Sequence, residues 1–221
     1  MGLVVVFVFI NIQSSLEDNS IKKSFEWLRT RNFLSLYMKI DEDTAIFVPK
    51  SMNENIERKF IACFVISAPQ NRLRRSAIRQ TWGKLIKPIF LIGQHDNDTM
   101  RSVVQEAREF NDIIIEDFVD SYINLTIKTA FAMKNFVTHF NNSKYFFKID
   151  DDAFLNVESL HKHLQSVPVN SLVGQSESHA IPVRNPNHHW YIPEFLFEED
   201  IYPPYLLGLS YLIPGGLSAL S

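Results

Sequence analysis

"KYFFKIDDDAFLN", residues Lys144–Asn156, runs from an apolar stretch straight into three consecutive aspartates. Like charges this close repel each other, and burying them without partners is costly. The pattern therefore indicates a buried strand whose tip holds a cation. A solvated acidic turn is the alternative that these residues alone leave open.

Stretches of strand and helix character alternate around this motif. Continuous apolar runs predict strands at 60–67, 86–93, 112–118 and 145–150. Helical patterns lie at 72–82, 99–110, 124–140 and 157–165. We expect Gly83 to close the first helix and Thr99 to cap the second. The alternation predicts an α/β domain with a largely parallel sheet, and the apolar strands need helices on both faces.

Composition narrows the class of protein. The chain has 221 residues, 46% of them hydrophobic, which is enough for a core, and its net charge of -3 gives no electrostatic sign of a nucleic-acid partner. Its one cysteine, Cys63, lies in an apolar run and is expected to be buried.

The three aspartates fall where an open parallel sheet binds ligands, beyond the carboxyl end of a strand. Carboxylates there suit a hard divalent cation such as Mg²⁺ or Mn²⁺, which fills its other positions with water and phosphate oxygens. Four arginines follow the first strand, namely Arg72, Arg74, Arg75 and Arg79, and Arg75 and Arg79 share a helix face. Guanidinium groups suit phosphate, although a basic surface helix is the alternative.

Four segments in register extend this interpretation. "RRSAIRQTWG", "DFVDSYINLTIKT", "YFFKIDDDAFLNVESL" and "YPPYLLGLSYLIP" together resemble the β-1,3-galactosyltransferase and β-1,3-N-acetylglucosaminyltransferase family. The resemblance implies a glycosyltransferase A-type fold, with a Rossmann-like half for a UDP-sugar and an acceptor half after the acid motif. It also implies Mn²⁺, UDP-galactose or UDP-N-acetylglucosamine as donor, a glycan of a glycoprotein or glycolipid as acceptor, and a type II Golgi membrane protein with a luminal catalytic domain.

The resemblance also implies roles for individual positions. Asp150 and Asp152 would bind the metal. Trp190, Tyr205 and Gly208 would lie on the acceptor side. The residues implied on the donor side are Ser67, Arg75, Arg79, Tyr122, Asn124, Lys128, Lys148, Asp150 and Asp151. The implied reaction is an inverting transfer of a hexose to a 3-hydroxyl in protein glycosylation, with a carboxylate as general base.

The resemblance also sets expectations for the two ends of the chain. Residues 1–57 are expected to form an apolar segment and stem that anchors the protein to the membrane. Because the apolar run is shorter than the roughly 20 residues that span a bilayer, a stray strand is the alternative for its first residues. Residues 58–221 are expected to be a transferase domain that is incomplete at its C-terminus, because the family's Glu-Asp motif is not reached. The catalytic residue therefore stays unknown, and a nucleotide-sugar-binding module without catalysis is the alternative.

Overall fold

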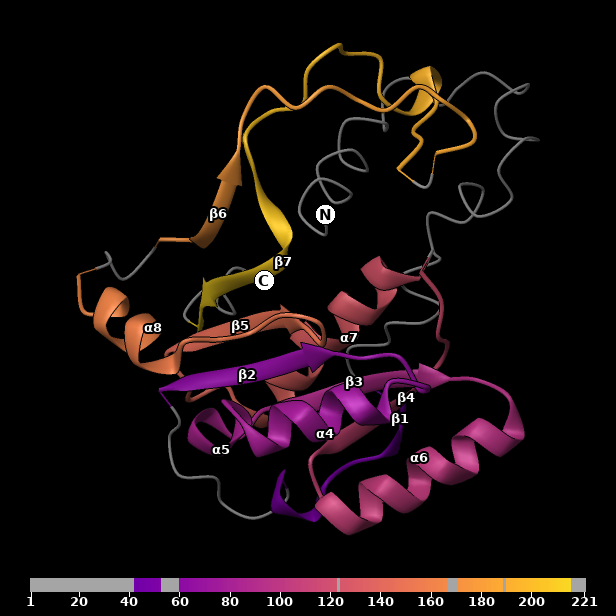
Figure 1. Ribbon diagram of the computed structural model, residues 1–221, viewed down its shortest axis with the longest axis vertical. Helices are drawn as coiled ribbons and strands as arrows, with labels where there is room; N and C mark the ends of the chain where they lie inside the picture. Colours follow the sequence, from indigo (N-terminus) through magenta and orange to yellow (C-terminus); the bar gives the residue numbers. More distant parts are fainter. Residues whose placement is uncertain (1–41, 53–59, 123, 167–170, 189, 216–221) are drawn as a thin grey trace.

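A seven-stranded mixed sheet forms the centre of the molecule (Figure 1). The computed structural model describes residues 42–52, 60–122, 124–166, 171–188 and 190–215. The strands are β1 Ala45–Phe47, β2 Ile61–Ile66, β3 Ile89–Gln94, β4 Ile113–Val119, β5 Tyr145–Asp150, β6 Val173–Glu177 and β7 Tyr205–Pro214. Their order is β1-β4-β3-β2-β5-β7-β6, with β4, β3, β2 and β5 parallel and the other pairings antiparallel. The predicted mixed, largely parallel sheet is confirmed.

Helices cover both faces of this sheet. The helices are α4 Arg72–Gln80, α5 Gly83–Ile86, α6 Asn97–Phe110, α7 Leu125–His139 and α8 Val157–Leu164, with short 3-10 turns η2 Lys50–Met52 and η3 Glu194–Leu196. Alternate strand residues point to opposite faces. In β5, Phe147 and Ile149 therefore pack in the cluster that includes α4, α6 and α8, while Phe146 packs against α7. Cys63 is buried in β2, as predicted.

Two predictions about helix ends are wrong. α4 ends at Gln80, and Gly83 begins the separate helix α5. A Cβ at Gly83 would lie 2.6 Å from the carbonyl oxygen of Ile78, so the missing side chain lets α5 pack against the end of α4. α6 is capped by Asp96, whose carboxylate accepts from the backbone N–H groups of Asp98 and Thr99. A carboxylate at this position also suits the positive end of the helix dipole.

The sheet includes residues that the sequence assigned to the stem. β1 pairs with β4, and the contact is reinforced by Glu116, which accepts from Thr44 Oγ1 at 2.8 Å and Asn135 Nδ2 at 2.6 Å. The sheet therefore begins before the boundary predicted at residue 58. Most of the predicted anchor and stem, residues 1–41, lies outside the described residues. Among the residues that are described, no helix is long and apolar enough to cross a membrane.

Candidate functional site

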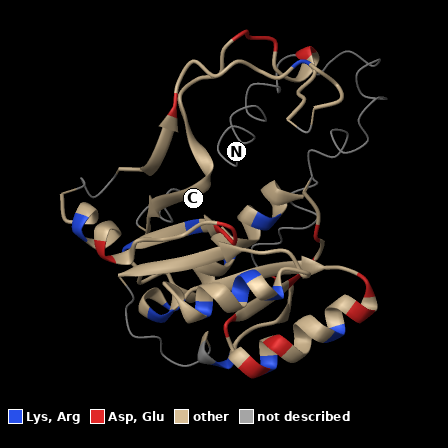
Figure 2. Cartoon of the chain, viewed as in Figure 1, with Lys and Arg blue, Asp and Glu red and all other residues tan. Residues whose placement is uncertain are grey.

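The three aspartates lie at the carboxyl end of β5, near the middle of the sheet. β5 pairs in parallel with β2, and Asp150 lies opposite Ile66, the last residue of β2. Because the two strands end level, the first turn of α4 faces the aspartates. Figure 2 shows the acidic segment after β5 beside the basic residues of α4.

Asp150 lies on the face of the sheet that α7 covers. Lys148 is two residues earlier in the same strand and points to the same face. Its Nζ donates to the carboxylate of Asp150 and to the carbonyl oxygen of Gly208 in β7. Burial raises the pKa of Asp150, and the ammonium of Lys148 opposes that rise. Lys148 thus joins the end of β5 to the strand predicted to carry acceptor-side residues.

Asp151 and Asp152 turn toward α4. The buried carboxylate of Asp151 accepts from Asn71 Nδ2 and from Arg74 Nη1, both at 2.8 Å. The same Arg74 nitrogen lies 3.3 Å from the more exposed carboxylate of Asp152. Asn71 is therefore a residue of the candidate site that the sequence prediction missed, whereas Arg74 is one of the arginines predicted near a phosphate. The spacing of three between Asn71 and Arg74, on the first turn after a central strand, was the signal that could have indicated Asn71.

The predicted metal ligands are Asp150 and Asp152. Their side chains keep 34% and 57% of their surface exposed, so oxygen atoms at the strand end remain accessible. Within the described ranges, no group of three or more His, Cys, Asp or Glu residues could hold a metal ion. A Mg²⁺-type site takes one or two carboxylates from the protein and fills the rest with water and phosphate oxygens. Asp150 faces α7 and Asp152 faces α4, so a hard divalent cation held by both carboxylates, and Mn²⁺ in particular, stays a prediction.

Arg75 is fully buried in a network that fixes the loop after β2. Its guanidinium donates to both carboxylate oxygens of Glu106, at 2.9 and 2.7 Å. It also donates to Ser67 Oγ at 3.0 Å and to the carbonyl oxygens of Ala68 and Pro69 at 2.6 and 3.1 Å. All five N–H groups of Arg75 are used. The contacts support a positioning role, and direct donor binding by Arg75 stays a prediction.

Arg79 extends the same network away from the aspartates. It makes two hydrogen bonds of 2.8 Å to Asp112, just before β4, and one of 2.7 Å to Glu106. Its guanidinium also lies 4.0 Å from the ring centre of Phe110. Asp112 lies at the amino end of β4, whereas the aspartates lie at the carboxyl end of the parallel strand β5. Arg79 therefore lies toward the opposite edge of the sheet from the strand-end cluster, which consists of Asn71, Arg74, Lys148, Asp150, Asp151 and Asp152.

Lys128 is buried beneath the strand ends. Its Nζ donates to the carbonyl oxygen of Ser67 at 2.6 Å and to Asp120 Oδ2 at 2.5 Å. Asp120 Oδ2 also accepts from the backbone N–H of Gly93 at 2.8 Å. Burial lowers the pKa of Lys128, and the nearby carboxylate of Asp120 partly offsets the effect. The pair joins the ends of β2, β3 and β4, so Asp120 is a second residue that sequence reasoning missed.

The predicted donor-side and acceptor-side segments meet at Tyr122. Trp190 Nε1 donates to Tyr122 Oη at 3.1 Å. Asn124 Nδ2 donates to the carbonyl oxygen of Val119 at 2.8 Å, which links the start of α7 to the end of β4. Tyr205 begins β7, and its ring makes an edge contact with the ring of Tyr202, with 6.1 Å between ring centres. The structure therefore brings Tyr122 and Trp190 together.

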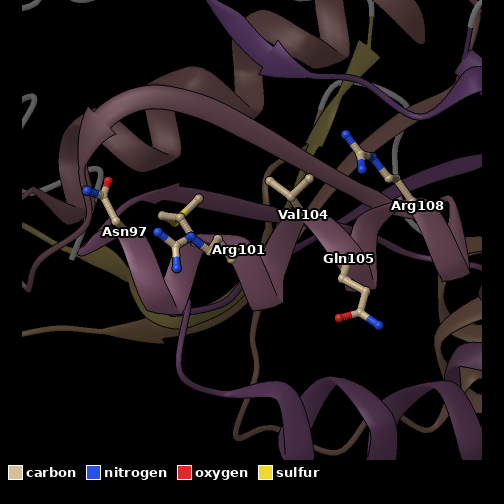
Figure 3. Close-up of a pocket in the computed structure, with 6 residues that line it drawn as sticks. Asn97, Arg101, Val104, Gln105 and Arg108 are labelled. Carbon is tan, nitrogen blue, oxygen red and sulfur yellow. The ribbon is translucent and has the colours of Figure 1, made fainter.

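A groove of about 570 Å³ lies elsewhere, along one side of α6 (Figure 3). The residues that line it are Asn97, Met100, Arg101, Val104, Gln105 and Arg108. None of them is a predicted site residue, and all lie on one helix. The strand-end cluster remains the candidate site because carboxylates that follow β4 and β5 meet cations from α4, α7 and β5 there.

Comparison with known proteins identifies the family. The family model described as galactosyltransferase matches residues 73–219. The chain belongs to the galactosyltransferase family. Its relatives include human β-1,3-galactosyltransferase 1, 31% identical over 183 residues, covering 78% of this chain and 56% of that protein. Human lactosylceramide 1,3-N-acetyl-β-D-glucosaminyltransferase is 32% identical over 174 residues, which cover 71% of this chain and 46% of that protein.

This galactosyltransferase-family chain thus spans about half the length of the relatives it matches. Among solved structures, an rRNA methylase from Streptococcus thermophilus aligns over 76% of this chain and 97% of its own, at 10% identity. Its TM-score of 0.21 is too low to support a structural relationship. Family membership therefore rests on the sequence relatives.

Proposed function

We propose that the protein is a hexosyltransferase that moves galactose or N-acetylglucosamine from a UDP-sugar to the 3-hydroxyl of an acceptor glycan. The observation that supports this most directly is the acid cluster at the carboxyl end of β5, in a chain of the galactosyltransferase family. We propose both sugars as candidates for the transferred group because one relative is named for galactose and the other for N-acetylglucosamine. The lactosylceramide in the second name supports a glycolipid among the acceptor candidates.

In this proposal, the acceptor hydroxyl displaces UDP from the anomeric carbon with inversion. Asp150 and Asp152 would hold Mn²⁺, which when bound offsets negative charge on the departing diphosphate. Lys148 holds the carboxylate of Asp150 in place from the same strand. Asn71 and Arg74 hold Asp151, which keeps the first turn of α4 beside the donor site. A carboxylate takes the proton of the hydroxyl as general base, and we assign it to no described residue.

The cellular setting is part of the same proposal. We infer a type II Golgi membrane protein that acts in the lumen on glycans of glycoproteins or glycolipids. The support is membership of the family, whose relatives are named as glycosyltransferases.

Substitution of Asp152 tests the proposed donor site. Asp152→Asn removes a charged oxygen ligand from an exposed position, so UDP binding measured by calorimetry with Mn²⁺ should weaken at least tenfold. The matched control is Asp98→Asn, an exposed aspartate at the start of α6 that pairs with Arg101 at 3.1 Å. Equal UDP affinity in Asp152→Asn and the unaltered protein would count against the site.

An assay of turnover separates the enzyme from a binding module. UDP-galactose and UDP-N-acetylglucosamine are each incubated with the protein and Mn²⁺, with and without a glycan acceptor, and released UDP is measured. Release that rises with acceptor supports transfer. Mn²⁺-dependent binding of UDP without any release would favour a nucleotide-sugar-binding module.

A further inference from the structure

The connection between β6 and β7, residues 178–204, is long and closes on itself. The backbone N–H of Tyr202 donates to the carbonyl oxygen of Ala180 at 2.8 Å, near the base of the connection. Val183 and Tyr191 form an isolated bridge within it. Figure 1 shows this segment extending beyond β6 and β7, away from α4 and α6. Long loops that pack on themselves are commonly functional.

The connection has a small apolar core of its own. Leu196 and Phe197 keep only 7% and 9% of their surface exposed, and Ile192, Phe195 and Tyr202 pack against them. The ring centres of Phe197 and Tyr202 are 4.6 Å apart. This packing gives the loop a defined shape without help from the main sheet.

Arg184 holds the backbone of the connection together. Its guanidinium donates to the carbonyl oxygens of Ile192 at 3.0 Å, Phe197 at 2.6 Å and Glu199 at 3.2 Å. One of these carbonyls precedes η3 and two follow it, so the Arg184 side chain links the backbone on both sides of η3. A lysine has a single ammonium in place of the planar fork and cannot reproduce all three contacts at once.

The opposite end of the connection presents Trp190. Its backbone N–H donates to His188 Nδ1 at 3.1 Å, and its indole Nε1 donates to Tyr122 Oη at 3.1 Å. Trp190 and Tyr122 nevertheless keep 53% of their surface exposed each. Tyr122 lies between β4 and α7, on the edge of the sheet where the parallel strands end. Two accessible aromatic side chains are thus fixed beside the strand-end cluster.

Such a surface suits a sugar ring. A hexopyranose has a face of C–H groups and a rim of hydroxyls, while tyrosine and tryptophan offer a flat apolar body with a polar tip. We propose that Trp190 and Tyr122 form one binding surface for the terminal hexopyranose of the acceptor, and that Arg184 is the positioning residue that presents it. This inference rests on the proposed function, since it names how that site recognises its acceptor.

The experiment measures binding of two probes to the full chain. Methyl β-D-galactopyranoside and methyl N-acetyl-β-D-glucosaminide are titrated by saturation-transfer NMR, and UDP with Mn²⁺ is titrated by calorimetry. Trp190→Ala should weaken glycoside binding by about tenfold, the loss expected for one aromatic contact, and leave UDP affinity within about twofold. Trp190→Phe, which keeps a ring, should lose less.

Arg184→Met should weaken glycoside binding as Trp190→Ala does, again with UDP affinity unchanged, and Arg184→Lys should rescue part of the loss. Global loss of the fold would weaken the binding of both probes, so unchanged UDP affinity shows that the effect is confined to the connection. Arg101→Met is the matched control because Arg101 is an exposed arginine on α6, and it should alter neither affinity.

The outcomes distinguish this inference from the proposed function. Wild-type glycoside affinity in Trp190→Ala and Arg184→Met would overturn the inference, as would the absence of glycoside binding by the unaltered protein. If UDP still bound in either case, the proposed donor site would remain supported. Glycoside binding without any UDP binding would instead overturn the proposed transferase and leave the sugar-binding surface.

Discussion

Replacing Arg75 with methionine should lower the free energy of unfolding by about 3–5 kcal/mol. The guanidinium is 0% exposed and makes five hydrogen bonds, two of them to Glu106. Methionine has a similar reach but supplies no donor. Glu106, 1% exposed, would keep only the 2.7 Å contact with Arg79. Removing one partner of a buried ion pair costs about this much because a charge is left poorly compensated.

The loss is large beside the roughly 5–15 kcal/mol that stabilises a typical domain, so it is readily measured by urea unfolding followed by circular dichroism. Arg72→Met is the matched control on the same helix. Arg72 has a 49% exposed side chain and one ion pair, 3.3 Å from Glu109. Its replacement should change stability by less than about 1 kcal/mol. The double variant Arg75→Met/Glu106→Met should recover part of the loss, because no buried carboxylate is then left.

The same experiment decides between two roles of Arg75. A variant that unfolds at the wild-type urea concentration but binds UDP more weakly would refute the structural reasoning. It would show that the guanidinium reaches the donor, as the sequence predicts. Loss of stability in Arg75→Met, with Arg75→Lys intermediate, supports the positioning role.

Three further changes concern buried groups of the sheet. Burial raises the pKa of Glu116 above its ordinary 4.5, so the folded state holds this proton more tightly than the unfolded chain. The contribution of Glu116 to stability is therefore fully present below its ordinary pKa and is lost as pH rises through the folded pKa; Glu116→Gln should remove this contribution to the fall in melting temperature, and an unaltered slope would contradict it. Lys128→Met leaves the carboxylate of Asp120 buried without its cation, so thermal scanning should give a melting temperature several degrees lower, and a change of less than one degree would argue against the pair. Gly93→Ala would put a Cβ 2.7 Å from the Phe118 ring and 2.8 Å from the carbonyl oxygen of Phe118, so urea unfolding should show a loss of about 1–3 kcal/mol, and wild-type stability would contradict this close packing.

The sheet could be predicted largely from its strands. Residues 145–149 are apolar apart from Lys148, and the structure buries Tyr145, Phe146 and Phe147 between helices on either side. Sequence alone could not place β1, because three residues carry little pattern and their pairing with β4 depends on buried contacts at Glu116. The antiparallel return of β7 beside β5 likewise depends on contacts distant in sequence.

The arginines show where the site prediction reached its limit. Helical spacing puts Arg75 and Arg79 on one face, and the structure agrees. The partner of that face is Glu106, 31 residues beyond Arg75, on a helix whose position follows from packing. Spacing within one helix could not indicate that this face is buried against α6. Arg74, on the neighbouring face, meets the aspartates instead.

The acid motif leaves unbalanced negative charge because of the strand that carries it. Alternation along β5 sends Asp150 toward α7, while Asp151 turns to α4, so no single helix could neutralise the motif. Lys148 forms an ion pair with Asp150, and Arg74 forms one with Asp151. Asp152 has only the longer 3.3 Å contact with the same Arg74. Three carboxylates thus share two side-chain cations at a strand end. A divalent cation would over-compensate that single excess charge, and the phosphate oxygens of a nucleotide would restore the balance, so we predict that the cluster binds the two together.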